Sequence, residues 1–181
     1  MKQLKYGRGE ICICKRSVIK VFLINLTILF SGLLIGILVY YALDLDLGKM
    51  KINNDIKISS IFLNNLLYFM ICMFGFVTIG LANITILLIN GGLIGFFLAH
   101  GMKTNQFLDV FLALAPHSII EIICLLISST YSYIILIVIY KRIFNKQKIP
   151  INLLKLTTYT FIGIVLLTYI GSLVEKYITL V

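Results

Sequence analysis

Charged side chains are scarce in this chain of 181 residues, and acidic ones are the scarcest, with 7 Asp and Glu against 16 Lys and Arg. Charged residues make up only 13% of the chain, whereas a soluble domain carries about 25%. Hydrophobic residues make up 60%, against about 45–50% in soluble proteins. This composition excludes an ordinary soluble enzyme, a disordered chain and a collagen-like chain. It indicates a protein whose solvent is the lipid bilayer.

The residue sets on which cofactor and catalytic sites depend are also missing. The four cysteines offer no disulfide framework, and Cys12 and Cys14 lack the further Cys or His that would complete a zinc site. The phosphate-binding GxxxxGK[ST] pattern, HExxH and GxSxG do not occur. We therefore expect no metal, no cofactor and no enzymatic activity, because an intramembrane enzyme would need a nucleophile or a metal set.

Long stretches without charge predict an all-α fold, a polytopic bundle of transmembrane helices. A helix that crosses the hydrocarbon core needs about 20 apolar residues, and two of the four apolar stretches are longer than one crossing. We predict a single integral membrane domain over 1–181 with about five crossings. Its segments are a basic tail at 1–20, crossings at 21–43, 60–80 and 84–99, an outer loop at 44–58, a broken helix with a fourth crossing at 107–140, a basic loop at 141–155 and a fifth crossing at 156–174.

The positions of lysine and arginine predict the orientation of the chain. Segments 1–20 and 141–155 hold most of the basic residues, and cytoplasmic segments are the ones enriched in Lys and Arg. We therefore expect both segments in the cytoplasm, four crossings between them, and a multi-pass protein of the cell membrane with a cytoplasmic N-terminus. The basic residues lie at the ends of apolar runs without a binding motif, so nucleic acid is not an expected partner.

The segment that begins at residue 107 is too long for one upright crossing and holds the sharpest feature of the sequence. Pro116 lacks a backbone donor and favours a break, with a short or re-entrant helix before it and a full crossing after it. His117 and Glu121 lie four residues apart and so share a helix face. A carboxylate is costly in the bilayer, so we expect Glu121 to be neutral or partnered and to face the interior, with His117 as the nearest partner. The pair is either a proton or ligand site or a polar lock that pins the helix.

Asparagines form a second group of polar residues within the apolar runs. Asn90 precedes Gly91 and Gly92, and an amide in lipid seeks an interhelical partner, while the glycines admit a close neighbour or permit a break in the helix. Asn90 is therefore either structural or a substrate contact. Asn64 and Asn65 are expected near the outer interface, as a helix cap or an interfacial polar pair.

Glycines mark the expected sites of close helix packing. Small residues four apart let two helix backbones approach each other in lipid, either inside the bundle or in a dimer. A turn between the second and third crossings is predicted at 80–83. The packing glycines are Gly32, Gly36, Gly75, Gly80, Gly91 and Gly95.

Residues 60–125 resemble the stage II sporulation protein M family. The resemblance rests on Asn64-Asn65, Gly75, Gly80, Asn90-Gly91 with Gly95, and Pro116-His117-x-x-x-Glu121. The family usually has glycine after the histidine, where this chain has Ser118. The resemblance implies a bacterial polytopic membrane protein without catalytic activity. Founding members are similar in anchoring a peptidoglycan-remodelling complex during engulfment, and other relatives occur beside transport ATPases in circular-bacteriocin gene clusters.

Two functions follow as hypotheses. The first is a non-enzymatic membrane scaffold or accessory subunit, with the bilayer and other membrane or exported proteins as partners, and with a homo-oligomer as a further expectation. The second is a permease-like subunit for export, maturation or immunity of a bacteriocin or another solute, working with a transport ATPase. In that case Asn90, His117 and Glu121 would line a path, because transporters place their sites where helices are broken and intramembrane groups are ionisable.

Overall fold

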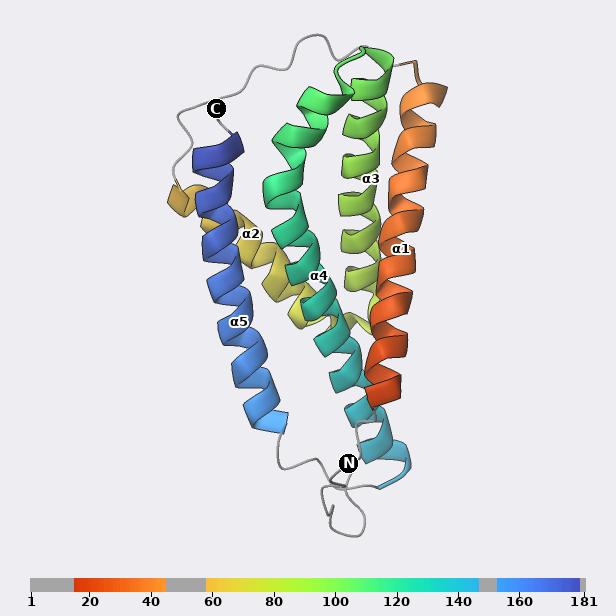
Figure 1. Ribbon diagram of the computed structural model, residues 1–181. Coiled ribbons are helices and arrows are strands. Elements are labelled where there is room, and N and C mark those ends of the chain that lie inside the picture. The colour runs from red at the N-terminus through yellow and green to blue at the C-terminus, as the bar shows by residue number, and fades with distance from the viewer. Residues whose placement is uncertain (1–14, 45–57, 147–152, 180–181) are drawn as a thin grey trace.

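The described residues form a bundle of helices without strands (Figure 1). The computed structural model describes residues 15–44, 58–146 and 153–179, apart from the side chains of residues 113, 116, 117, 178 and 179. This arrangement confirms the predicted all-α polytopic fold. The elements are α1 Lys15–Ala42, α2 Ile58–Met73, the short 3₁₀ helix η1 Gly75–Thr78, α3 Leu81–Lys103, α4 Phe107–Phe144, α5 Leu153–Val174 and the π-helical turn η2 Glu175–Thr179.

Among the described residues, four stretches of helix are long and apolar enough to cross a membrane. They are α1, α3, the Ser118–Phe144 part of α4, and α5 continued to Tyr177. The described part of α2 has 16 residues and extends about 24 Å, which is less than the hydrocarbon thickness of about 30 Å. This helix lies obliquely across the bundle (Figure 1). The predicted second crossing is thus a short, tilted helix beside four longer ones.

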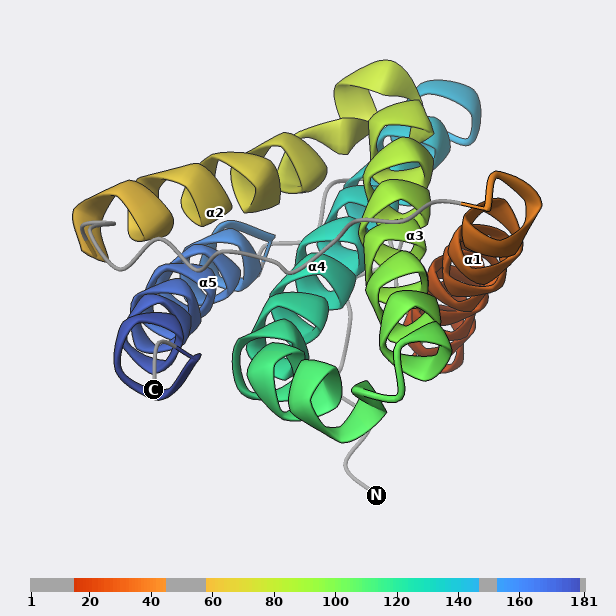
Figure 2. The ribbon, with the colours of Figure 1, turned by 90° about the horizontal axis from the view of Figure 1, so that it is seen from above.

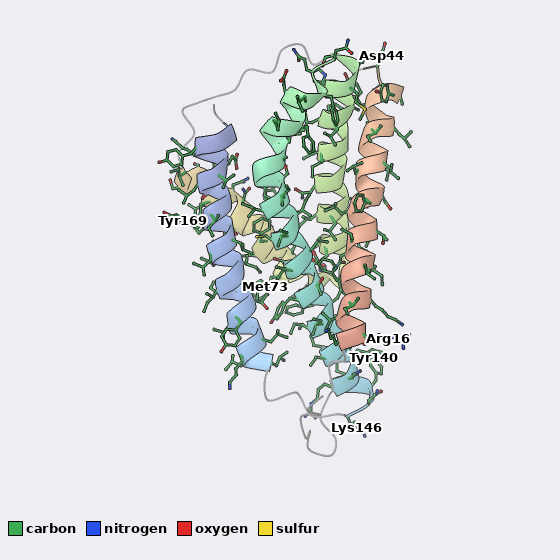
Figure 3. All side chains as sticks on the ribbon, in the orientation of Figure 1. Arg16, Asp44, Met73, Tyr140, Lys146 and Tyr169 are labelled. Carbon is green, nitrogen blue, oxygen red and sulfur yellow. The ribbon has the colours of Figure 1, made fainter. Side chains whose placement is uncertain are left out.

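The described parts of the two basic segments lie at the same end of the bundle (Figure 3). Figure 3 shows Arg16 and Lys146 at one end and Asp44 at the other. α1 is already helical at Lys15 and Arg16, before the apolar run, and both residue types are good helix formers that can continue a helix into the polar interface. The chain therefore returns to the same end between Arg16 and Lys146 (Figure 3), which the predicted orientation requires.

α4 is the central helix of the bundle. In the most apolar stretch of α4, 61% of the residues are buried inside the bundle, against 22% in the corresponding stretches of α1 and α3 and 11% in that of α5. Seen from above, α4 lies among α2, α3 and α5 (Figure 2). Buried side chains from each neighbour pack around it, including Leu29 of α1, Phe69 of α2, Leu87 of α3 and Ile164 of α5.

α1 and α3 run parallel and touch through their backbones. A Cβ atom at Gly36 would overlap the carbonyl group of Gly92, and one at Gly32 would overlap that of Leu88. From the other side, Cβ atoms at Gly91 and Gly95 would overlap backbone atoms of α1. The two GxxxG motifs therefore pack against each other inside one chain, as lipid-embedded helices do when small residues let them approach.

The turn between α2 and α3 precedes the predicted position. Residues 74–80 make the reversal, and α3 already begins at Leu81, whereas the turn was expected at 80–83. Gly80 has a φ of 85°, a left-handed conformation that favours glycine. The Tyr133 hydroxyl of α4 donates a hydrogen bond to the Gly80 carbonyl over 3.2 Å, and Gly75 lies against the side chain of Asn83. The Tyr133 contact fastens the turn to the central helix, and the Asn83 contact joins it to the first turn of α3.

α4 continues through Pro116 as one helix and bends instead of breaking. Its 38 residues are helical from Phe107 to Phe144, and its first turns run at an angle to the rest (Figures 1 and 2). Proline lacks the N–H that a helix interior requires, and a bend is the usual response when the helix continues on both sides. The predicted interruption of the helix is therefore corrected to a bend.

Candidate functional site

A pocket of about 150 Å³ between α3 and α4 brings polar side chains together. Asn90 comes from α3, and Ser118 and Glu121 come from α4. Residues three, four and seven positions apart share a helix face, so α4 presents Ser118 and Glu121 to the same space. The fold thus places two of the predicted intramembrane polar residues, Asn90 and Glu121, in one pocket.

Apolar side chains make up the rest of the pocket wall. In such surroundings electrostatic interactions are stronger than in water, and an unpaired polar group is costly. Ser118 is 9% exposed, so its hydroxyl is a buried polar group in this wall. The wall is completed by Leu93, Ile94, Phe97, Leu114, Ile122 and Leu125.

Asn90 makes its hydrogen bond within its own helix. The side-chain Nδ2 donates to the carbonyl oxygen of Ile86 over 2.8 Å. α3 continues without a break through Gly91 and Gly92. This bond uses the amide nitrogen and leaves the amide oxygen as the acceptor of the side chain. The close contact with α1 is made by the glycines of this segment, and Asn90 lines the pocket.

Two further polar groups approach Glu121 from other elements. Asn65 of α2 interacts with the Glu121 carboxyl group, and Glu175 of η2 lies within electrostatic range of it. Asn64 is exposed, whereas Asn65 is partly buried. Neighbouring residues on a helix point about 100° apart, so the asparagine pair is divided between the surface and the interior.

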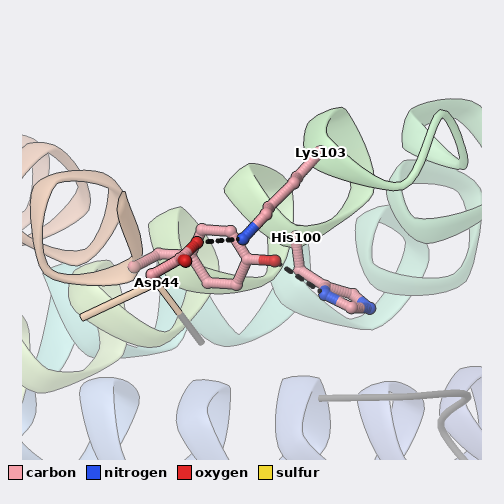
Figure 4. A network of polar contacts seen from close by, with 4 residues as sticks. Asp44, His100 and Lys103 are labelled. Atoms are coloured by element: carbon pink, nitrogen blue, oxygen red, sulfur yellow. Dashed lines mark hydrogen bonds and ion pairs between the residues drawn. The ribbon is translucent and has the colours of Figure 1, made fainter. Parts of the chain in front are cut away.

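A second polar network lies between α1 and α3 at the end of the bundle that holds Asp44 (Figure 4). The Tyr40 hydroxyl and Nδ1 of His100 form a hydrogen bond of 3.1 Å, with both residues buried. Lys103 pairs with Asp44 and lies 5.6 Å from the centre of the Tyr40 ring. The hydrogen bond and the charge of Lys103 lower the pKa of Asp44 below its usual value of 3.8. This network joins α1 and α3 at this end of the bundle.

Comparison with known proteins places the chain in a family. The family model of stage II sporulation protein M matches residues 26–180, which include the pocket and the Tyr40–His100 network. The chain belongs to the stage II sporulation protein M family. The resemblance seen in residues 60–125 is thus confirmed and extends over most of the chain. An uncharacterized protein of Methanocaldococcus jannaschii is 31% identical over 143 residues, which are 75% of this chain and 78% of the relative. No solved structure matches the chain.

In this stage II sporulation protein M family chain, Pro116 and His117 lie in α4 close to the pocket residue Ser118. Their side chains lie outside the described residues. The predicted pairing of His117 with Glu121 therefore stays a prediction based on their spacing of four residues. Within the described ranges, no three His, Cys, Asp or Glu side chains come together as metal ligands.

Sequence reasoning missed a set of buried hydroxyl groups in the middle of α4. Ser128, Ser129 and Ser132 are fully buried, and Thr130 accepts a hydrogen bond of 3.2 Å from the Asn25 side chain of α1. The signal was present as a run of polar residues at 128–132 inside an apolar segment. Average hydropathy hides such a run because serine and threonine lower it only slightly.

Proposed function

We propose that this protein is a non-enzymatic scaffold or accessory subunit that holds another membrane protein in a bacterial membrane complex. The outer face of α2 carries this proposal. Leu63, Leu67 and Ile71 of α2, and Phe74 directly after its end, are between 43% and 61% exposed, and their spacing places them along one side. Together they form a continuous apolar strip, which we call the α2 face.

The oblique path of α2 (Figure 1), together with the short reach of its described part, is the reason to expect a protein on the α2 face. A helix shorter than the hydrocarbon layer is accommodated by thinning of the bilayer or by association with another protein. α1 and α3, by contrast, are closed against each other through glycine. A transmembrane segment of a partner, laid along the α2 face, would cover the apolar strip and remove the mismatch. Membership of the stage II sporulation protein M family supports a membrane role of this kind.

Capture of the partner from membranes of the native host tests the proposal. The double variant Leu67→Ala and Phe74→Ala trims the α2 face. The matched control, Leu34→Ala and Leu38→Ala, trims two lipid-facing residues of α1 that are 61% and 67% exposed. We expect a protein that co-purifies in mild detergent to be lost several-fold from the α2 variant and retained by the control, at equal chain abundance. Equal recovery from both variants, or no partner with the unaltered chain, would overturn the proposal.

A second candidate is a permease-like subunit that works with a transport ATPase, for example in export of or immunity to a bacteriocin. The pocket favours it, because Asn90, Ser118 and Glu121 meet at membrane depth beside a bent helix. Glu121→Gln and His117→Ala should then abolish transport or immunity without changing the amount of protein in the membrane. A parallel loss of abundance and function would instead identify these residues as a structural lock.

A further inference from the structure

The polar atoms at the pocket between α3 and α4 are suited to accept hydrogen bonds. The amide nitrogen of Asn90 is already bonded to Ile86, which leaves the amide oxygen. Glu121 contributes a carboxyl group, and Ser118 contributes a buried hydroxyl group. A ligand that complements three oxygen atoms must bring several N–H or O–H donors. An ammonium group has three donors and no acceptor.

The charges at the pocket favour a cation. Glu121 lies in apolar surroundings, within electrostatic range of the second carboxyl group of Glu175. Burial and a like charge both oppose ionisation of a carboxyl group. A cation that enters the pocket offsets both effects, and the Asn65 side chain further supports the Glu121 carboxylate. A hard metal ion fits less well, since it would need six or more oxygen ligands.

The walls of the pocket select an organic cation with a short apolar stem. A cavity of about 150 Å³ holds a ligand of roughly six carbon atoms. Leucine and isoleucine line most of the wall, and Phe97 adds an aromatic ring of the kind that attracts cations. We propose that this pocket binds a protonated primary amine about the size of a lysine side chain, held by Glu121, Ser118 and Asn90.

The amine can come from two sources. A lysine in a transmembrane segment of the partner would place the group in the pocket, and this source rests on the proposed scaffold function. A free alkylamine would reach the same pocket without a partner. The chemistry of recognition is the same in both cases, so binding of a simple amine is tested first.

Purified full-length protein in lipid nanodiscs is titrated with n-butylammonium chloride, and binding is followed by ligand-observed NMR. Equal concentrations of n-butanol and sodium chloride serve as probes of the stem alone and of a simple cation. Glu121→Gln keeps the shape of the side chain and removes its charge. Asp109→Asn is the matched control, because Asp109 is an exposed acid on the same helix.

We expect butylammonium to bind the unaltered chain and Asp109→Asn equally. Binding should weaken about tenfold or more in Glu121→Gln, because hydrogen bonds to charged groups are strong, and several-fold in Ser118→Ala. Ile94→Phe, which fills the pocket and leaves the charge in place, should also lose binding; it decides the question if Glu121→Gln fails to fold. Equal binding of butanol or sodium, or full binding by Ile94→Phe, would overturn the proposal.

The partner assay separates the two sources. If excess butylammonium displaces the captured partner, a lysine of the partner occupies the pocket. If butylammonium binds and the partner stays, the ligand is a free amine. If butylammonium does not bind while capture through the α2 face persists, the amine site is wrong and the scaffold function stands.

Discussion

A single methyl group at Gly36 should decide whether α1 and α3 can pack. In Gly36→Ala the added carbon would overlap the carbonyl oxygen of Gly92, which is backbone and cannot turn aside as a side chain can. The helices must separate, and overpacking of this kind costs about 1–3 kcal/mol. Alanine recovers about 1 kcal/mol of helix propensity. Because backbone adapts poorly, we expect a net loss of about 1–2 kcal/mol in the free energy of unfolding.

Two other glycines supply the controls for Gly36→Ala. A Cβ atom at Gly163 has no atom within 4 Å, so Gly163→Ala should gain up to about 1 kcal/mol. A Cβ atom at Gly92 lies 3.6 Å from the carbonyl oxygen of Gly32, an ordinary contact, so Gly92→Ala should behave like Gly163→Ala. Unfolding by SDS in mixed micelles, followed by far-UV circular dichroism, measures all three. Equal stability of Gly36→Ala and Gly163→Ala would refute the reasoning.

Three further predictions concern the outer ion pair, the buried hydroxyl groups and the orientation of the chain. Lys103 lowers the pKa of Asp44 below 3.8, so this pair stabilises the fold above that pH, and its contribution is lost as the pH falls through the lower folded pKa. Thermal unfolding below about pH 4 should therefore depend slightly less on pH in Asp44→Asn, and identical profiles would contradict the pairing. Ser132→Ala should leave the free energy of unfolding within about 0.5 kcal/mol or raise it, because the buried hydroxyl has no partner among the described residues; a loss above about 1 kcal/mol in chemical denaturation would show that it is bonded after all. In a chain freed of its own cysteines, an impermeant maleimide added to intact cells should label Asp44→Cys and spare Lys146→Cys, and the opposite pattern would reverse the predicted orientation.

The membrane fold could be predicted because apolar length and charge are properties of the linear sequence. The run at 21–43 and the basic segments at 1–20 and 141–155 need no knowledge of neighbours. The tilt of α2 could not be predicted this way, because it depends on how the helix packs against α4 and α5. The unbroken course of α4 through Pro116 was also out of reach, since a proline can either end a helix or bend it.

The candidate site was predicted in part. Asn90 and Glu121 are conspicuous because polar residues are rare in apolar runs. Their meeting in one pocket depends on the register between α3 and α4. The approach of Glu175 depends on where the π-helical turn at the end of α5 comes to lie, which no local pattern reports. From the sequence, Asn65 was assigned to the interface. Its partial burial depends on the oblique path of α2, which the sequence does not report.

The parallel pairing of α1 and α3 sets an order for biosynthesis. Two neighbouring helices that run in the same direction cannot form a hairpin, so the glycine face of α1 has no partner until α2 and α3 have been made. At about 5–20 residues per second, the more than fifty residues between Gly36 and Gly92 delay the partner by several seconds. During that time the newly inserted α1 exposes its glycine face, which can fit the small-residue faces of other helices in the membrane. The rate of synthesis and the insertion machinery therefore help to decide whether α1 packs against α3 of the same chain.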